Sequence, residues 1–180
     1  MKHQAITLYT IGHSTRPLEE FTKVLHAHSI QALVDIRAFP MSRRLPHFNR
    51  EALAESLAIE KIQYVWMKEL GGRRKKLRDD SPNVALRNES FRNYADYMLT
   101  PEFQKAAEHV HELAGRAPTA IMCAEKVFFH CHRMLVSDYF ALHGDQVLHI
   151  QDTSPPRQHV VTKEARIAEG KLVYDAGVLF

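Results

Sequence analysis

The feature that most constrains this chain is the repeated alternation of short apolar runs with amphipathic segments. The runs are rich in β-branched and aromatic residues, as buried strands are. They lie at residues 5–11, 30–36, 62–66, 119–124 and 146–150. Segments with helical spacing of apolar residues separate them. This order predicts parallel βαβ units with right-handed crossovers and helices on both faces of one sheet.

Polar residues mark where the intervening helices begin and end. We expect Thr15 to cap the first helix and Asn49 the second. Thr100 followed by Pro101 forms a cap and first helical position for a later helix, which Gly115 is expected to end.

The length of 180 residues is sufficient for one substantial core, and the sequence contains no repeat or low-complexity tract. We therefore predict a single three-layer, Rossmann-like α/β domain over residues 1–180, with a mostly parallel sheet of about five strands. Its tail, residues 152–180, forms an extension in which a small hairpin turns at Glu169 and Gly170.

The N-terminal apolar run is too short and too soon interrupted for a signal peptide or a membrane span. Without an export signal, Cys123 and Cys131 are expected to be free thiols rather than a structural disulfide. These features predict a cytoplasmic protein with no membrane partner. The sequence leaves the oligomeric state open.

One segment is much more basic than the chain as a whole, whose formal charge is only +3. Six cations and a single acid lie between residues 68 and 78, inside a stretch from 67 to 89 that shows no periodic element. A loop of that length in a compact domain is usually functional or mobile. Both a solvated loop and a phosphate-binding loop fit this composition.

Ligands of open α/β sheets bind beyond the carboxyl ends of the strands, so polar residues at these ends are candidates for a site. Four of the predicted strands end in such residues. They are His13 and Ser14 after the first, Asp35 and Arg37 after the second, Glu69 after the third, and Cys123 and Glu125 after the fourth.

The most reactive segment is residues 122–133, where a strand ends in Cys-Ala-Glu and a helix opens with Cys-His-Arg. A thiolate is stabilised by a helix N-terminus and by nearby cations, and Arg133 suits a bidentate anion contact. Cys123 fits a nucleophile and a small core residue equally well, whereas Cys131 favours packing. His132 and Glu125 are the acid–base candidates.

A zinc site built from Cys123, Glu125, Cys131 and His132 is chemically conceivable. Its spacing, however, resembles none of the usual tetrahedral patterns. We therefore predict no metal and no other cofactor.

Asp35 and Arg37 point to the same face of a strand, so they form either a structural ion pair or part of a substrate site. Further cations lie in nearby loops, and we expect them to line a cationic mouth for a polyanion. These are Arg43, Arg44, His47, Arg73 and Arg74. The sequence has no glycine-rich phosphate fingerprint of the dinucleotide or nucleoside triphosphate type.

Several motifs together resemble the domain-of-unknown-function 488 family. They are YTIGHSTRPLEEF, LVDIRAFPMSRRLPHFN, KELGGRRK, RNESFRNYADYM and MCAEKVFFHCHR, and the resemblance covers about residues 7–151. It implies an α/β fold with a pocket formed by Gly12–Ser14, Asp35 with Arg37, Gly71–Arg73 and Cys123–Arg133. The resemblance implies no particular reaction.

Three functions fit this sequence. The first is an enzyme acting on a phosphate-bearing substrate, a nucleotide or nucleic acid, with Glu125 or Asp35 as acid or base and the arginines as phosphate clamps. The second is rhodanese-like thiol chemistry at Cys123, although the spacing from Cys123 to Arg133 exceeds the short loop of such enzymes. The third is a non-catalytic nucleic-acid-binding module.

Overall fold

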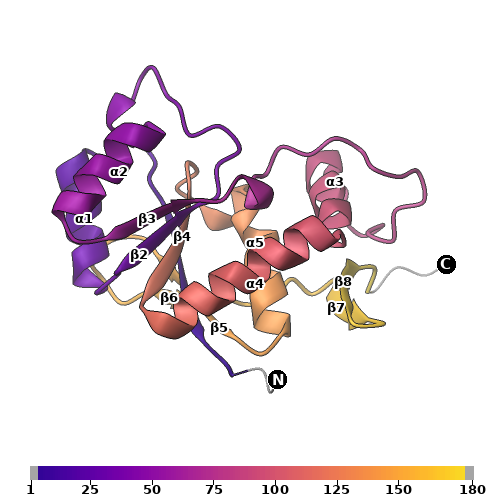
Figure 1. Cartoon of the computed structure of the whole chain (residues 1–180). Helices are drawn as coiled ribbons and strands as arrows, with labels where there is room; N and C mark the ends of the chain where they lie inside the picture. The colour runs from indigo at the N-terminus through magenta and orange to yellow at the C-terminus, as the bar shows by residue number, and fades with distance from the viewer. Residues whose placement is uncertain (1–3, 177–180) are drawn as a thin grey trace.

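The computed structural model describes residues 4–176 and consists of one main sheet, five helices and a separate hairpin (Figure 1). The strands are β1 (Thr7–Gly12), β2 (Ala32–Asp35), β3 (Gln63–Trp66), β4 (Thr119–Cys123), β5 (Gln146–Ile150), β6 (Arg157–Gln158), β7 (Ala165–Ala168) and β8 (Lys171–Tyr174). The helices are α1 (Leu18–Ala27), α2 (Arg50–Ile59), α3 (Glu89–Met98), α4 (Pro101–Arg116) and α5 (Arg133–Leu142).

The main sheet has the order β3-β2-β4-β1-β5-β6, and its first five strands are parallel. The register pairs Gly12 with Cys123 and Asp35 with Met122, so β1, β2 and β4 end at the same edge. The predicted mostly parallel sheet is confirmed. Strand β6 adds an antiparallel sixth member that the sequence did not reveal, because it has only two residues.

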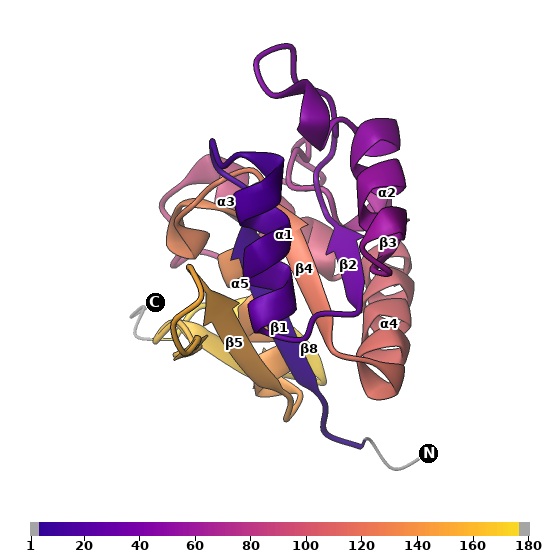
Figure 2. The same ribbon diagram turned by 90° about the vertical axis from the view of Figure 1, so that its left-hand side faces the viewer.

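Helices cover both faces of the sheet, which confirms the three layers. Helices α1 and α2 pack on one face through Phe21, Leu25, Leu53 and Leu57. The other face is covered by α4 and α5, and α3 packs against α4 and β8 beside them. Phe103 of α4 is fully buried in the apolar cluster on this side. Figure 2 shows α1 in front of the sheet.

The expected helix boundaries are only partly correct. Thr100 Oγ1 accepts a hydrogen bond from the main-chain N–H of Phe103 at 3.4 Å, which confirms this cap. Helix α1, however, starts after Pro17, and Thr15 makes no capping bond. The Asn49 side chain accepts from the N–H of Ser42 at 2.6 Å instead of capping α2.

Helix α4 continues one residue past Gly115 to Arg116, so the glycine does not end it. The methyl group of an alanine at this position would contact only Ile6, at 3.7 Å. Nothing in the local packing therefore forces the helix to stop there.

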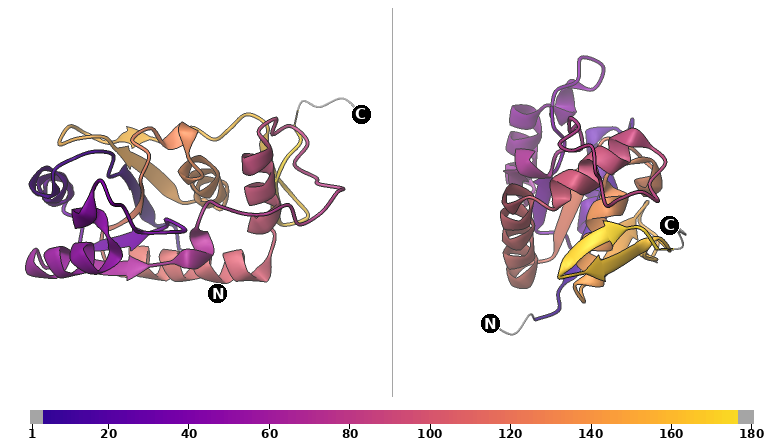
Figure 3. Two further views of the ribbon diagram at one scale, coloured as in Figure 1. Left: turned by 90° about the horizontal axis from the view of Figure 1, so that it is seen from above. Right: turned by 90° about the vertical axis from the view of Figure 1, so that its right-hand side faces the viewer.

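The predicted hairpin is present, and it turns at Glu169 and Gly170, both with positive φ. It lies beside α3 (Figure 3). Tyr174 fixes it there, since its main-chain N–H donates to Asn83 Oδ1 and its hydroxyl donates to Asp138. The single-domain prediction over residues 1–180 stays a prediction, and residues 1–3 and 177–180 lie outside the described part.

Within residues 4–176, no helix combines the length and the apolar character needed to cross a membrane.

Candidate active site at the carboxyl edge of the sheet

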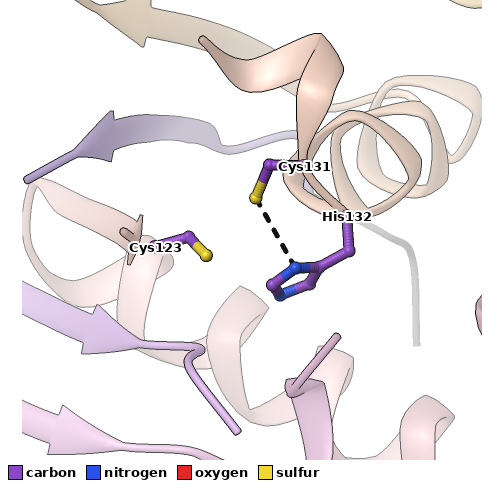
Figure 4. A group of neighbouring side chains, drawn as sticks. All are labelled: Cys123, Cys131 and His132. Carbon is purple, nitrogen blue, oxygen red and sulfur yellow. Dashed lines mark hydrogen bonds between the residues drawn. The ribbon is translucent and has the colours of Figure 1, made fainter. Parts of the chain in front are cut away.

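Cys123, Cys131 and His132 point into one common space at the carboxyl edge of the sheet (Figure 4). Cys123 ends β4, while Cys131 and His132 immediately precede α5. Both sulfur atoms and a ring nitrogen of His132 lie within 4.8 Å of one another. All three side chains are buried, and no other His/Cys/Asp/Glu group of this kind occurs among residues 4–176.

The ring of His132 is held in a defined orientation. Its Nε2 lies 3.0 Å from the carbonyl oxygen of Ile36, which can only accept, so Nε2 carries the hydrogen. In the neutral ring, Nδ1 then presents a lone pair, and it lies 3.5 Å from Cys131 Sγ. The ring of Tyr94 packs edge-on against that of His132, with centroids 5.1 Å apart.

Gly72 explains the glycine pair in the 71–73 motif. A Cβ at Gly72 would collide with the His132 ring, and one at Gly71 would come within 2.9 Å of the Cα of Ala38. The two glycines therefore allow the loop after β3 to pass directly over the histidine. The same packing brings Arg73 to the rim of the site.

The two thiols differ in their affinity for a proton. The interaction with the neighbouring Cys123 thiol lowers the pKa of Cys131, and its contacts with His132 and Arg133 act in the same direction against the effect of burial. The interaction with Cys131, together with burial, raises the pKa of Cys123. The main-chain N–H of Arg133 also donates to Cys131 Sγ, at 3.5 Å. Cys131, and not Cys123, is therefore the more readily ionised thiol.

Arg133 shapes the site from inside the protein. Its side chain is 1% exposed, and it donates to the carbonyl oxygens of Glu125 and Lys126 and to Thr10 Oγ1. Gly12 leaves room for this arrangement, because a Cβ there would overlap the Glu125 carbonyl. The predicted phosphate clamp thus holds the loop that follows β4.

Asp35 and Arg37 also form an internal pair. Arg37 donates to both carboxylate oxygens of Asp35, at distances between 2.5 and 3.1 Å, and also to the carbonyl of Phe48. The Tyr64 hydroxyl donates to Asp35 at 2.6 Å. Because Asp35 is fully buried and its oxygens are occupied, the geometry favours the structural interpretation of this pair.

His13 belongs to the same internal network. Its ring stacks on Phe48 with centroids 4.1 Å apart, and its Nε2 lies 3.3 Å from Arg37. Burial, followed by the charge of Arg37, lowers the pKa of His13 to about 4. The lowered pKa means that His13 is uncharged at neutral pH. The nearby His47 contacts the carbonyl oxygen of Arg16 at 3.1 Å.

The loop arginines form two groups: Arg74 is bonded within its own loop, and the other three are exposed. Arg74 donates to three carbonyl oxygens of residues 68–71 and stacks on Tyr97 at 3.6 Å, so it stabilises its own loop. Arg43 and Arg44 are exposed on the loop between β2 and α2. Arg73 is also exposed, but it lines the cavity above the cysteines and lies over the ring of Phe39 at 5.9 Å.

This cavity has a volume of about 510 Å³, and the Cys123, Cys131 and His132 cluster forms part of its wall. Glu125 and Arg73 bring opposite charges to it, and Phe39 and Met41 bring exposed apolar surface. A second cavity of about 420 Å³ shares Arg37, Phe39, Met41 and Glu125 with the first and includes His13 and Ser14. Because they share these residues, the two cavities are adjacent at the carboxyl edge of the sheet, and we refer to them together as the edge groove.

A buried hydrogen-bond chain extends from Arg133 to the far side of α5, and sequence reasoning missed it. Arg133 donates to Thr10, whose hydroxyl lies 2.7 Å from His149 Nδ1. His149 Nε2 lies 2.9 Å from His159 Nδ1, and His159 Nε2 lies 2.8 Å from Asp138. The sequence offers little indication of this chain, because Thr10 and His149 lie in ordinary strands, His159 lies in the tail, and the protein has twelve histidines.

Fold and site together define an α/β protein with a Cys-Cys-His cluster in a groove at the carboxyl edge of a parallel sheet. The family model described as "Domain of unknown function DUF488" matches residues 17–140, more than half of the chain. The chain therefore belongs to the DUF488 family. The match starts after the Gly12–Ser14 motif and is shorter than the resemblance expected from the sequence. No curated protein and no solved structure matches the chain.

Proposed function

We propose that this protein is an enzyme that acts on a phosphate-bearing substrate, a nucleotide or a nucleic-acid end, bound in the edge groove. One observation carries this proposal: a single cavity combines the Cys-Cys-His cluster with a carboxylate, a cation and an exposed aromatic ring. Concave sites that combine apolar walls with a few convergent polar groups are the usual locations of catalysis.

Phe39 and Arg73 supply the features that favour a nucleotide. Phe39 is 69% exposed at the cavity, and such rings stack on nucleic-acid bases at a gain of about 1–3 kcal/mol per base. Arg73 is the exposed arginine of the cavity and is therefore available to a phosphate group. Arg37 and Arg133 act indirectly, because both side chains are buried and donate to protein acceptors through their terminal nitrogens.

Glu125 is the acid–base group of this proposal. It follows β4 directly, its side chain is exposed, and it lines the same cavity as the cluster. Its main-chain carbonyl is held by Arg133, so the carboxyl group extends from a fixed point of the backbone. Asp35, by contrast, lies out of reach of a ligand because it is fully buried.

The test is a turnover screen with nucleotides, phosphate monoesters and short oligonucleotides that bear terminal phosphates. The wild type is expected to convert at least one of them, Glu125→Gln to lose most of kcat, and Arg73→Ala or Phe39→Ala to raise KM. Lys75→Ala is the matched control, since Lys75 is exposed in the same loop but does not line the cavity. Equal kinetics of Arg73→Ala, Phe39→Ala and the control would refute the proposal.

A second candidate is nucleophilic thiol chemistry, and a specific contact favours it. Cys131 Sγ lies 3.5 Å from His132 Nδ1, and the histidine is oriented in turn by Ile36, which is the arrangement of an activated nucleophile. The reactive thiol is then Cys131 rather than Cys123. Alkylation of Cys131 faster than that of Cys123 by about tenfold or more supports this candidate, and equally slow alkylation of both thiols contradicts it.

We also propose a cytoplasmic location, since both cysteines are free thiols and neighbouring thiols stay reduced in reducing compartments.

A further inference from the structure

The cluster of Cys123, Cys131 and His132 has the ligand types and the interatomic distances of a zinc site. We infer that these three residues bind a zinc ion in the edge groove. This inference rests on the proposed function and names the cofactor of the same site. Two thiolates and one imidazole form a ligand set that zinc accepts, and three protein ligands are typical of catalytic rather than structural zinc sites.

The distances agree with tetrahedral coordination. A sulfur at ~2.3 Å and a nitrogen at ~2.0 Å from one tetrahedral zinc ion lie about 3.5 Å from each other. Cys131 Sγ and His132 Nδ1 are 3.5 Å apart, and Cys123 Sγ lies within 4.8 Å of both. A single ion therefore reaches all three atoms with little movement of the side chains.

The surroundings of the ligands also fit a metal site. A histidine ligand of zinc normally donates its other ring N–H to a carbonyl or carboxylate, and His132 Nε2 donates to the Ile36 carbonyl at 3.0 Å. The main-chain N–H of Arg133 points at Cys131 Sγ, which is a common contact of bound thiolates. Gly72 and Tyr94 hold the imidazole ring from two sides.

The fourth coordination position faces the cavity, because all three ligand residues line it. A water molecule bound there has a pKa near neutrality, and the exposed carboxylate of Glu125 lines the same cavity and can accept its proton. The resulting hydroxide lies in the groove where the proposed phosphate group binds. In this account Cys131 is a zinc ligand and not the nucleophile of the second candidate function.

Metal content and cobalt spectroscopy of the full chain test this inference. The purified wild type is expected to contain about one zinc per chain. After chelation and addition of cobalt alone under reducing conditions, it should show the thiolate-to-cobalt charge-transfer band and the strong visible bands of a tetrahedral site. Cys123→Ser, Cys131→Ser and His132→Ala should each lose these bands. His26→Ala is the control and should retain them, because His26 lies in the last turn of α1 and is not part of the cluster.

A wild-type protein that takes up neither zinc nor cobalt overturns the inference, as does binding that all three ligand variants retain. Loss of folding in a variant is recognised by near-ultraviolet circular dichroism, and the stabilisation of the wild type by added zinc provides a test that needs no variant. Zinc binding without turnover of any phosphate substrate refutes only the proposed function. Turnover by a protein that neither contains zinc nor takes it up refutes only the zinc site.

Discussion

At the scale of single residues, the site depends on side chains whose donors point inward. Arg37 and Arg133 were predicted as phosphate clamps, but both are buried and their terminal nitrogens donate to protein acceptors. Their charge and position follow from the sequence, whereas their partners are determined by the three-dimensional fold. A sequence contains no direct measure of whether a guanidinium is free. Arg73 differs from both because its side chain is exposed, and this difference can be seen only in the folded structure.

Gly72→Ala is predicted to damage the site more than the fold. The added methyl group collides with the His132 ring, so either the ring or the loop must move, at a cost of about 1–3 kcal/mol. We expect loss of the cobalt spectrum and a lower free energy of unfolding. Gly115→Ala is the control, because its methyl group has room inside α4 and should leave the site intact and raise stability. A normal cobalt spectrum in Gly72→Ala would contradict this account.

His149 is predicted to make stability dependent on pH. Burial, followed by the charges of His159 and Arg133, lowers its pKa from 6.5 to about 3 in the folded state. Between these values the unfolded chain binds the proton and the folded chain does not, so stability falls as the pH drops below 6.5. His149→Gln should therefore show a weaker decrease in the free energy of unfolding between pH 7 and about pH 4. An unchanged slope, measured by denaturant titration, would exclude this role.

At the scale of elements, periodicity identified the five parallel strands and the alternation of strands with helices, but the exact helix ends depended on competition for polar groups. Asn49 has the right position to cap α2, yet its side chain bonds to Ser42 in the preceding loop. The long segment 67–88 contains only a short 3₁₀ turn at Lys68–Leu70, as expected from its lack of periodicity. Its packing against His132 through Gly72 could not be predicted, because it depends on a contact with the distant start of α5.

Thr100→Ala is predicted to destabilise the protein by about 1 kcal/mol, because Thr100 caps α4 through the N–H of Phe103. Thr15→Ala should change the free energy of unfolding by less than about 0.5 kcal/mol, since Thr15 is exposed and makes no cap. Denaturant unfolding of both variants provides the comparison. Equal losses would mean that the cap geometry does not explain stability.

At the scale of the whole molecule, the groove combines segments that are distant in the sequence. The Gly12–Ser14, Asp35–Arg37, Gly71–Arg73 and Cys123–Arg133 motifs meet there because they follow β1, β2, β3 and β4, which are adjacent parallel strands. Strand ends in an α/β sheet are predictable, so the meeting of these motifs at one edge followed from the sequence, and their role as a site stays a prediction. The convergence of Cys123, Cys131 and His132 did not, because their spacing resembles no standard metal motif.

The most direct test of the central claim is a crystal structure of the protein with a nucleotide at saturating concentration. The account predicts the phosphate group in the groove between Arg73 and the Cys-Cys-His cluster, and the base on Phe39. A nucleotide bound elsewhere would contradict the assignment of this groove as the substrate site. So would the absence of bound nucleotide in crystals grown or soaked with a large excess of it.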